Sequence, residues 1–239
     1  MKRICVSVGL LLFGCSDDGG GGEPIALEDF SLALSTASCD VQFECCTAAE
    51  IMAQYMGITF EGEPITTEEQ CVTFSDAVFS SFGVARYEAS IALGRMEFDG
   101  AAAAECVAAI EDVTCAQYSS GAIDVDSSCR PFLLPKVGDG GACTQDYECT
   151  SRNCVGEDVP LEGESTDGAC EPFAGPGEPC DDNCAPGQYC RFDPMGSDPD
   201  TCQDLEADGE ACFRDSDCVS DFCGDTDLCE PKPVTCTGA

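Results

Sequence analysis

The sequence predicts a small disulfide-rich protein, in which an N-terminal disulfide-tied α-helical domain is followed by three short cysteine-rich modules with little regular secondary structure. Two observations support this prediction. The chain contains 22 cysteines in 239 residues, and small exported domains use disulfides where they cannot bury enough apolar surface. The pattern also changes along the chain, because helical apolar spacing occupies residues 24–135 and a cysteine repeat occupies residues 138–239.

The beginning of the chain is typical of an export signal. Two basic residues precede an apolar run of ten residues, Ile4 to Phe13, which is too short to span a bilayer. The run leads to Leu-Phe-Gly-Cys, ending at Cys15, and this sequence resembles a bacterial lipobox. In that signal, residues 1–14 are removed and acyl chains on Cys15 attach the protein to a membrane. The alternative is an ordinary signal peptide that is cut elsewhere.

The segment that follows the signal predicts a tether, and the whole mature chain is strongly acidic. Residues 15–23 comprise the lipidated cysteine and a Gly-rich, acidic stretch typical of a flexible linker. Without residues 1–14, the chain has eight basic and 46 acidic residues, a net charge of −38. Such a surface repels nucleic acid and anionic membranes, and it attracts basic partners. Solubility is the alternative explanation of this charge.

Apolar spacing and capping signals predict the first helices. Phe30 and Val41 lie on one face of a first helix at helical spacing. Capping-box patterns predict further helix starts after Thr47 and near Thr67. The helix that starts near Thr67 is expected to place Val78 on the same apolar face as its cysteine.

The sequence also predicts a third capped helix and a short strand before it. The third helix is expected to start after Asp99, with Val107 on one of its sides. Before it, Ala89, Ile91 and Leu93 alternate with smaller or polar residues. This alternation predicts a short strand between the last two helices of the domain.

The second region contains a degenerate repeat in which each module begins with Gly-x-x-Cys. The modules span about 140–172, 177–204 and 209–231. The first and third share the spacing Cys-x5-Cys-x4-Cys, whereas the middle module has drifted. Such regular recurrence indicates internal duplication. Each module has few large apolar residues, so two disulfides, each stabilising by about 2–4 kcal/mol, replace a hydrophobic core.

The motifs of the first and third modules carry a family resemblance. They are Gly140-x-x-Cys143 with Cys149-x4-Cys154, and Gly209-x-x-Cys212 with Ser220-x-x-Cys223. These motifs resemble the Dickkopf N-terminal cysteine-rich domain as it occurs in bacterial proteins. The whole chain is similar to cysteine-rich lipoproteins of myxobacteria and related soil or predatory bacteria, in which a helical cysteine domain precedes such repeats. The resemblance implies an architecture and no particular activity.

We expect twenty cysteines to form disulfides, since Cys5 leaves with the signal and Cys15 is acylated. They are Cys39, Cys45, Cys46, Cys71, Cys106, Cys115, Cys129, Cys143, Cys149, Cys154, Cys170, Cys180, Cys184, Cys190, Cys202, Cys212, Cys218, Cys223, Cys229 and Cys236. The modules hold twelve of these and the helical region holds seven, which leaves Cys236. If the modules are self-contained, Cys236 must pair with the helical region.

Cys45 and Cys46 are the candidate partners of Cys236. Adjacent residues on a helix point about 100° apart, so these two cannot share one partner. A bond from either one to Cys236 would fold the tail back onto the helices and disfavour an extended stalk. Within the first and third modules, we expect first-to-third and second-to-fourth pairing, although sequence alone does not fix connectivity.

The composition limits the chemistry that the chain can perform. It contains no His, which excludes His triads and His general bases. It also lacks a Cys-x-x-Cys knuckle for zinc. Asp215-x-Asp217, Asp225-x-Asp227, Asp124-x-Asp126 and the cluster of Asp193, Asp198, Asp200 and Asp204 suggest at most weak Ca²⁺ binding, because no EF-hand pattern is present. We therefore predict no catalytic residue, no metal site and no cofactor.

These observations favour a non-enzymatic binding or adhesive protein of the bacterial cell envelope, anchored at the outer membrane or cell surface. The expected partner is a surface protein or a glycan, and not nucleic acid. An envelope hydrolase that uses paired carboxylates and a purely structural spacer are the alternatives. Phe173, Tyr189 and Phe213 are candidate contact residues, but we favour their interpretation as small hydrophobic plugs of the modules.

Overall fold

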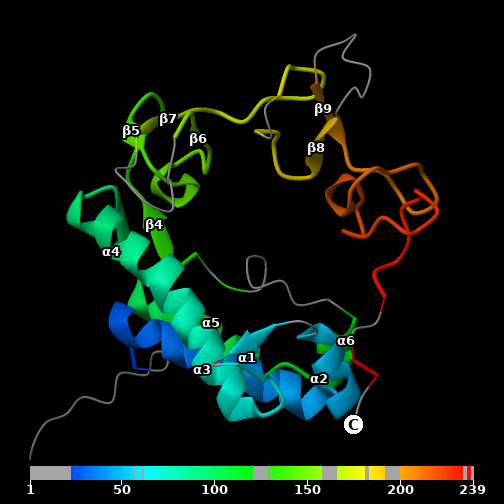
Figure 1. Ribbon diagram of the computed structural model, residues 1–239. Coiled ribbons are helices and arrows are strands. Elements are labelled where there is room, and N and C mark those ends of the chain that lie inside the picture. Colours follow the sequence, from blue (N-terminus) through cyan, green and yellow to red (C-terminus); the bar gives the residue numbers. More distant parts are fainter. Residues whose placement is uncertain are drawn as a thin grey trace, which may run out of the picture.

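A helical region and three small modules make up the described part of the chain (Figure 1). The computed structural model describes residues 23–55, 58–60, 62–120, 129, 131–157, 166–180, 183–191, 200–233 and 236–237. The predicted signal peptide and Cys15 lie outside the described residues. Among the residues described, no helix has both the length and the apolar character needed to cross a membrane.

The helical region is built around its first helix, α1. The elements are α1 (Leu27–Cys45), α2 (Ala48–Gln54), α3 (Glu68–Phe79), a π-helical turn (Ser80–Val84), α4 (Ala85–Ala92), α5 (Gly100–Glu111) and α6 (Cys115–Ser119). Helix α1 contacts α3, α5 and α6. Phe30 of α1 is fully buried, with the rings of Phe79, Phe98 and Phe132 around it. This aromatic cluster belongs to the largest buried apolar cluster of the described residues.

The predicted helix starts are confirmed by their caps. Thr47 and Thr67 each form a capping box with the Glu or Gln three residues later. Asp99 accepts hydrogen bonds from two backbone N–H groups at the start of α5. The predicted apolar face of α3 is wrong at its end, because the side chain of Val78 is 42% exposed. The apolar faces predicted at Phe30, Val41 and Val107 are confirmed, because these three residues are buried.

The strand predicted over residues 89–93 is also wrong. Residues Ala85–Ala92 form α4, which continues α3 through the π-helical turn. Ser90 is buried and donates its hydroxyl to Glu148. Ser90, one of the residues that suggested a strand, instead connects α4 to the first module.

The strands are short and all their pairings are antiparallel. They are β1 (Thr59–Phe60) with β2 (Glu63–Pro64), β3 (Met96–Phe98) with β4 (Leu133–Pro135), β5 (Ala142–Cys143) and β6 (Cys154–Val155) on either side of β7 (Gly168–Cys170), and β8 (Gln188–Arg191) with β9 (Thr201–Asp204). Two 3₁₀ turns, Asp146–Glu148 and Asp215–Asp217, occupy equivalent places in the first and third modules. Hairpins this small need further stabilisation.

The described residues contain ten disulfides, six of which lie in the modules. The helical region contains Cys39–Cys71, Cys45–Cys115 and Cys106–Cys129, and Cys46–Cys236 joins it to the tail. The modules contain Cys143–Cys154, Cys149–Cys170, Cys180–Cys190, Cys184–Cys202, Cys212–Cys223 and Cys218–Cys229. Each module therefore has first-to-third and second-to-fourth pairing, as predicted for the first and third. Module 1 denotes residues 140–172, module 2 residues 177–204 and module 3 residues 209–231.

The modules form an arc that leaves the helical region and returns to it. Figure 1 shows module 1 following β4, module 2 beyond it, and module 3 leading back toward α2 and α6. The end of the described chain lies beside α2, where Cys236 bonds to Cys46. The arc is thus closed covalently, in agreement with the predicted fold-back and not with a stalk extended from one end.

Candidate functional site

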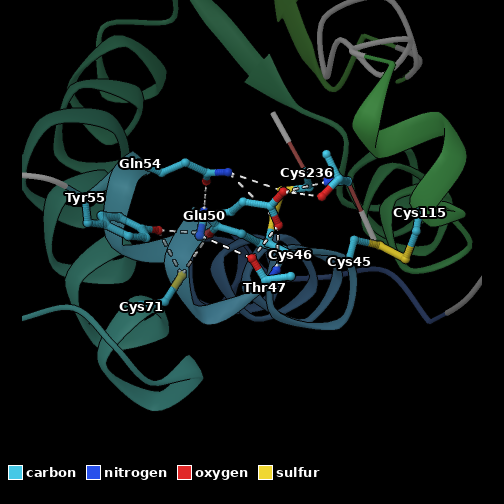
Figure 2. The surroundings of a disulfide bond; sticks show 11 residues. Cys45, Cys46, Thr47, Glu50, Gln54, Tyr55, Cys71, Cys115 and Cys236 are labelled. Atoms are coloured by element: carbon cyan, nitrogen blue, oxygen red, sulfur yellow. Dashed lines mark hydrogen bonds between the residues drawn. A yellow bond between two sulfur atoms is a disulfide. The ribbon is translucent and has the colours of Figure 1, made fainter. Parts of the chain in front are cut away.

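The disulfide that closes the arc is buried and lies next to another disulfide. Cys46 and Cys236 are 190 residues apart in sequence, with their Cα atoms 4.8 Å apart. Figure 2 shows this bond beside Cys45–Cys115, so the two adjacent cysteines hold different partners. The side-chain amide of Gln54 donates to Cys236 Sγ at 3.3 Å. Of the two predicted partners of Cys236, the structure selects Cys46.

A carboxylate of α2 reinforces this closure. The backbone N–H and the hydroxyl of Thr237 both donate to Glu50 Oε1 at 2.7 Å, and Thr47 donates twice to Oε2 (Figure 2). These hydrogen bonds, that of the Thr237 hydroxyl above all, lower the pKa of Glu50 to about 2. The tail of the chain and the start of α2 therefore share one ionised carboxylate.

Module 1 is joined to the helical region through a buried acid. Glu148 is fully buried and accepts hydrogen bonds from the Ser90 hydroxyl and, at 2.6 Å, from the backbone N–H of Thr144. The guanidinium of Arg95 lies 3.6 Å from Glu148 and forms two hydrogen bonds, of 3.0 and 2.8 Å, with Asp167. One surface of module 1 thus receives a hydroxyl and a cation from another part of the protein.

The Asp-x-Asp pair of module 3 has a structural role. Asp215 Oδ1 accepts the backbone N–H of Cys223 at 2.8 Å, and Asp217 Oδ2 accepts those of Phe213 and Arg214 at 2.9 and 3.0 Å. In module 1, Asp146 accepts from Cys154 in the same way. These oxygens are therefore already used to shape the modules. Of the other candidate calcium ligands, Asp124, Asp126, Asp193 and Asp198 lie outside the described residues.

A cavity of about 270 Å³ lies where module 2 meets module 3. Its lining residues are Tyr189, Arg191, Glu206, Glu210, Ala211, Cys212, Phe213, Arg214 and Asp217. Arg214 donates to the backbone carbonyl of Cys190 at 2.8 Å, which ties module 3 to module 2. The cavity is therefore held by a direct contact between two disulfide-locked modules.

The aromatic side chains of this cavity differ in their surroundings. The hydroxyl of Tyr189 donates to Glu206 at 2.9 Å, and burial together with this carboxylate raises the pKa of Tyr189 to about 12. Phe213, in contrast, is 80% exposed. Its interpretation as a hydrophobic plug is therefore wrong. Phe173 is half-buried and does not line this cavity.

Sequence reasoning named Phe213 and Asp217 separately but missed the cavity that they share. The signal was present in the repeat, because Phe213 directly follows the first cysteine of module 3 where module 1 has Thr144. A large apolar residue at a position where the equivalent module has a small polar residue indicates that the two modules use this position differently. The repeat does not predict that Tyr189 and Arg191 line the cavity, because their position there depends on how modules 2 and 3 contact each other.

Comparisons of the chain with models of protein families, with curated proteins and with solved structures find no match. The resemblance to Dickkopf-type modules therefore stays a prediction. The ten disulfides indicate an oxidising, exported environment.

Proposed function

We propose that the protein is a lipid-anchored binding protein of the bacterial cell envelope, which contacts its partner through the surface around Phe213. The observation that carries this proposal is the 80% exposed ring of Phe213 at a cavity shared by two modules. Aromatic residues and Arg are the types enriched at protein interfaces, and this cavity has two of each. Binding residues also concentrate on loops that a rigid scaffold holds in place.

Rigid presentation of this surface favours binding. Modules 2 and 3 each contain two disulfides, and Arg214 fixes their junction. A surface that is already ordered loses little conformational entropy when a partner binds. The covalent closure at Cys46 and the tether predicted at residues 15–23 would then hold this surface close to the membrane.

Anchoring is tested at the predicted lipidation site. We expect Cys15→Ser to move the protein from the membrane fraction to the soluble fraction or to leave its signal peptide uncut, because no acyl chain can be attached. Fractionation and intact-mass measurement decide between these results. Cys5→Ser, within the segment predicted to be removed, is the matched control and should leave the mass of the mature protein unchanged. A Cys15→Ser protein that is processed normally and stays in the membrane would contradict lipid anchoring.

Binding is tested by crosslinking the tagged full-length protein in intact producing cells. We expect a defined crosslinked partner whose yield falls several-fold in Phe213→Ala. Val219→Ala is the control, because Val219 is a 67% exposed apolar residue of the same module that does not line the cavity. Equal yields from all three proteins would refute binding through this surface.

A further inference from the structure

We infer that the cavity between modules 2 and 3 receives a basic side chain, Lys or Arg, from a partner protein. This inference rests on the proposed function and specifies the chemical class of the partner. It follows from a comparison of the same surface position in modules 1 and 3, and from the charges that line the cavity.

In module 1, the acid at the compared position already binds donor groups from elsewhere in the protein. Glu148 and Asp217 each lie five residues after the first cysteine of their modules, and both are buried. Glu148 receives the hydroxyl of Ser90, with the guanidinium of Arg95 3.6 Å away. The helical region supplies both groups. The buried acid of this module type can therefore serve as a docking point for donor and cationic side chains.

In module 3, the equivalent acid has an acceptor without a hydrogen bond. Asp217 Oδ2 accepts two backbone N–H groups, but Asp217 Oδ1 accepts no hydrogen bond from the residues that the structure describes. Arg214 Nε forms an ion pair with this oxygen at 3.5 Å, as Arg95 does with Glu148 at 3.6 Å. Asp217 is only 4% exposed, and a buried carboxylate oxygen without a hydrogen bond is costly. The wall of the cavity therefore contains a buried carboxylate whose hydrogen bonds are less complete than those of Glu148 in module 1.

The rest of the lining favours a positively charged donor. Glu206 and Glu210 add two carboxylates, so three acidic groups face two guanidinium groups. Arg191 already donates to Gln203, and Arg214 to the carbonyl of Cys190. The whole chain has a net charge of −36, which attracts a basic partner and repels an acidic one.

The shape of the cavity suits one long side chain. Its volume of about 270 Å³ lies below the range typical of drug-sized ligands. The exposed ring of Phe213 can pack against the methylene stem of Lys or Arg and attract its cationic head group. The carboxylates would then accept hydrogen bonds from the head group.

The test uses dye-labelled, end-capped pentapeptides with a central Arg or Lys among glycines. The controls carry the neutral isosteres citrulline and acetyl-lysine. Fluorescence anisotropy with the purified full chain should show that at least one charged peptide binds about tenfold more tightly than its neutral isostere. Phe213→Ala should weaken that binding about tenfold, and Glu210→Gln should weaken it several-fold. Glu44→Gln, an exposed acid in α1, and Val219→Ala are the matched controls and should leave the affinity unchanged.

Two results would overturn the inference: neutral isosteres that bind as tightly as the charged peptides, or charged-peptide binding that Phe213→Ala leaves unchanged. The in-cell crosslinking experiment keeps this failure separate from failure of the proposed function. A partner that is captured through Phe213 but proves to be a glycan, or a protein without a basic contact residue, would support the proposed function and refute the basic partner. Loss of any Phe213-dependent capture would refute both.

Discussion

Modules 1 and 3 share a disulfide frame and differ in what covers it. Both have first-to-third and second-to-fourth disulfides, and in both a 3₁₀ turn supplies a buried acid. In module 1 this acid, Glu148, lies against α4 of the helical region. In module 3 the equivalent Asp217 faces a cavity beside the exposed Phe213. The cysteines and acids thus define a scaffold, and the residues between them decide whether a module docks internally or presents a surface.

The two modules are also attached to the helical region by different means. Module 1 follows β4 directly and is fixed by the contacts of Glu148 and Arg95. Module 3 is linked to the helical region through the tail, by the Cys46–Cys236 disulfide and the hydrogen bonds between Thr237 and Glu50. One junction is a buried polar contact and the other is a covalent closure at the end of the chain, so each can be disrupted separately.

The largest expected difference comes from removing the equivalent acids. We expect Glu148→Ala to lower the free energy of unfolding by about 3–5 kcal/mol, because Ser90 and Arg95 lose a buried partner. Asp217→Ala should cost only about 1–2 kcal/mol, since it removes a backbone cap beside a cavity that water can enter. Denaturant unfolding, with hydrogen exchange to locate the loss, measures both. Equal losses of unfolding free energy in the two variants would show that Glu148 and Asp217 have the same structural role.

Removing the covalent closure should affect module 3 and spare module 1. The Cys46–Cys236 loop is long, but other disulfides already restrain the chain inside it, so we expect Cys46→Ser with Cys236→Ser to cost about 2–4 kcal/mol. Small-angle scattering should show a larger radius of gyration, while the contact between Arg95 and Asp167 persists. Cys180→Ser with Cys190→Ser is the control, because it removes a disulfide inside module 2 and leaves the arc closed. An unchanged radius in the first variant would show that contacts other than the disulfide hold the tail.

The sequence was informative where the decisive signal was local or countable. Capping boxes at Thr47 and Thr67 need only neighbouring residues, and the cysteine count placed the partner of Cys236 in the helical region, where the adjacency of Cys45 and Cys46 made these two the candidates. The strand predicted at residues 89–93 failed because burial of Ser90 depends on Glu148, 58 residues away. The exposure of Phe213 was likewise missed, because it depends on how modules 2 and 3 meet and not on the composition of either one.

The smallest expected effect concerns the carboxylate that holds the tail. Glu50 has a pKa of about 2, and the Thr237 hydroxyl is the main cause. We expect Thr237→Ala to raise this pKa toward the ordinary value of 4.5, although Thr47 should keep it from reaching that value. Carboxyl-detected NMR titration measures the shift.

The sign of the accompanying pH effect follows from the lowered pKa. The stabilisation that Glu50 provides is complete above about pH 4.5 and is lost as the pH falls toward 2. Hydrogen exchange at Thr237 should therefore show that the tail loosens within that window, and Glu50→Gln should remove this pH dependence. The matched variant Glu44→Gln, also on the helical region but away from the tail, should retain it. A Thr237 amide whose protection does not change across the window would show that the disulfide alone holds the tail, so that module 3 is attached to the helical region by one covalent bond.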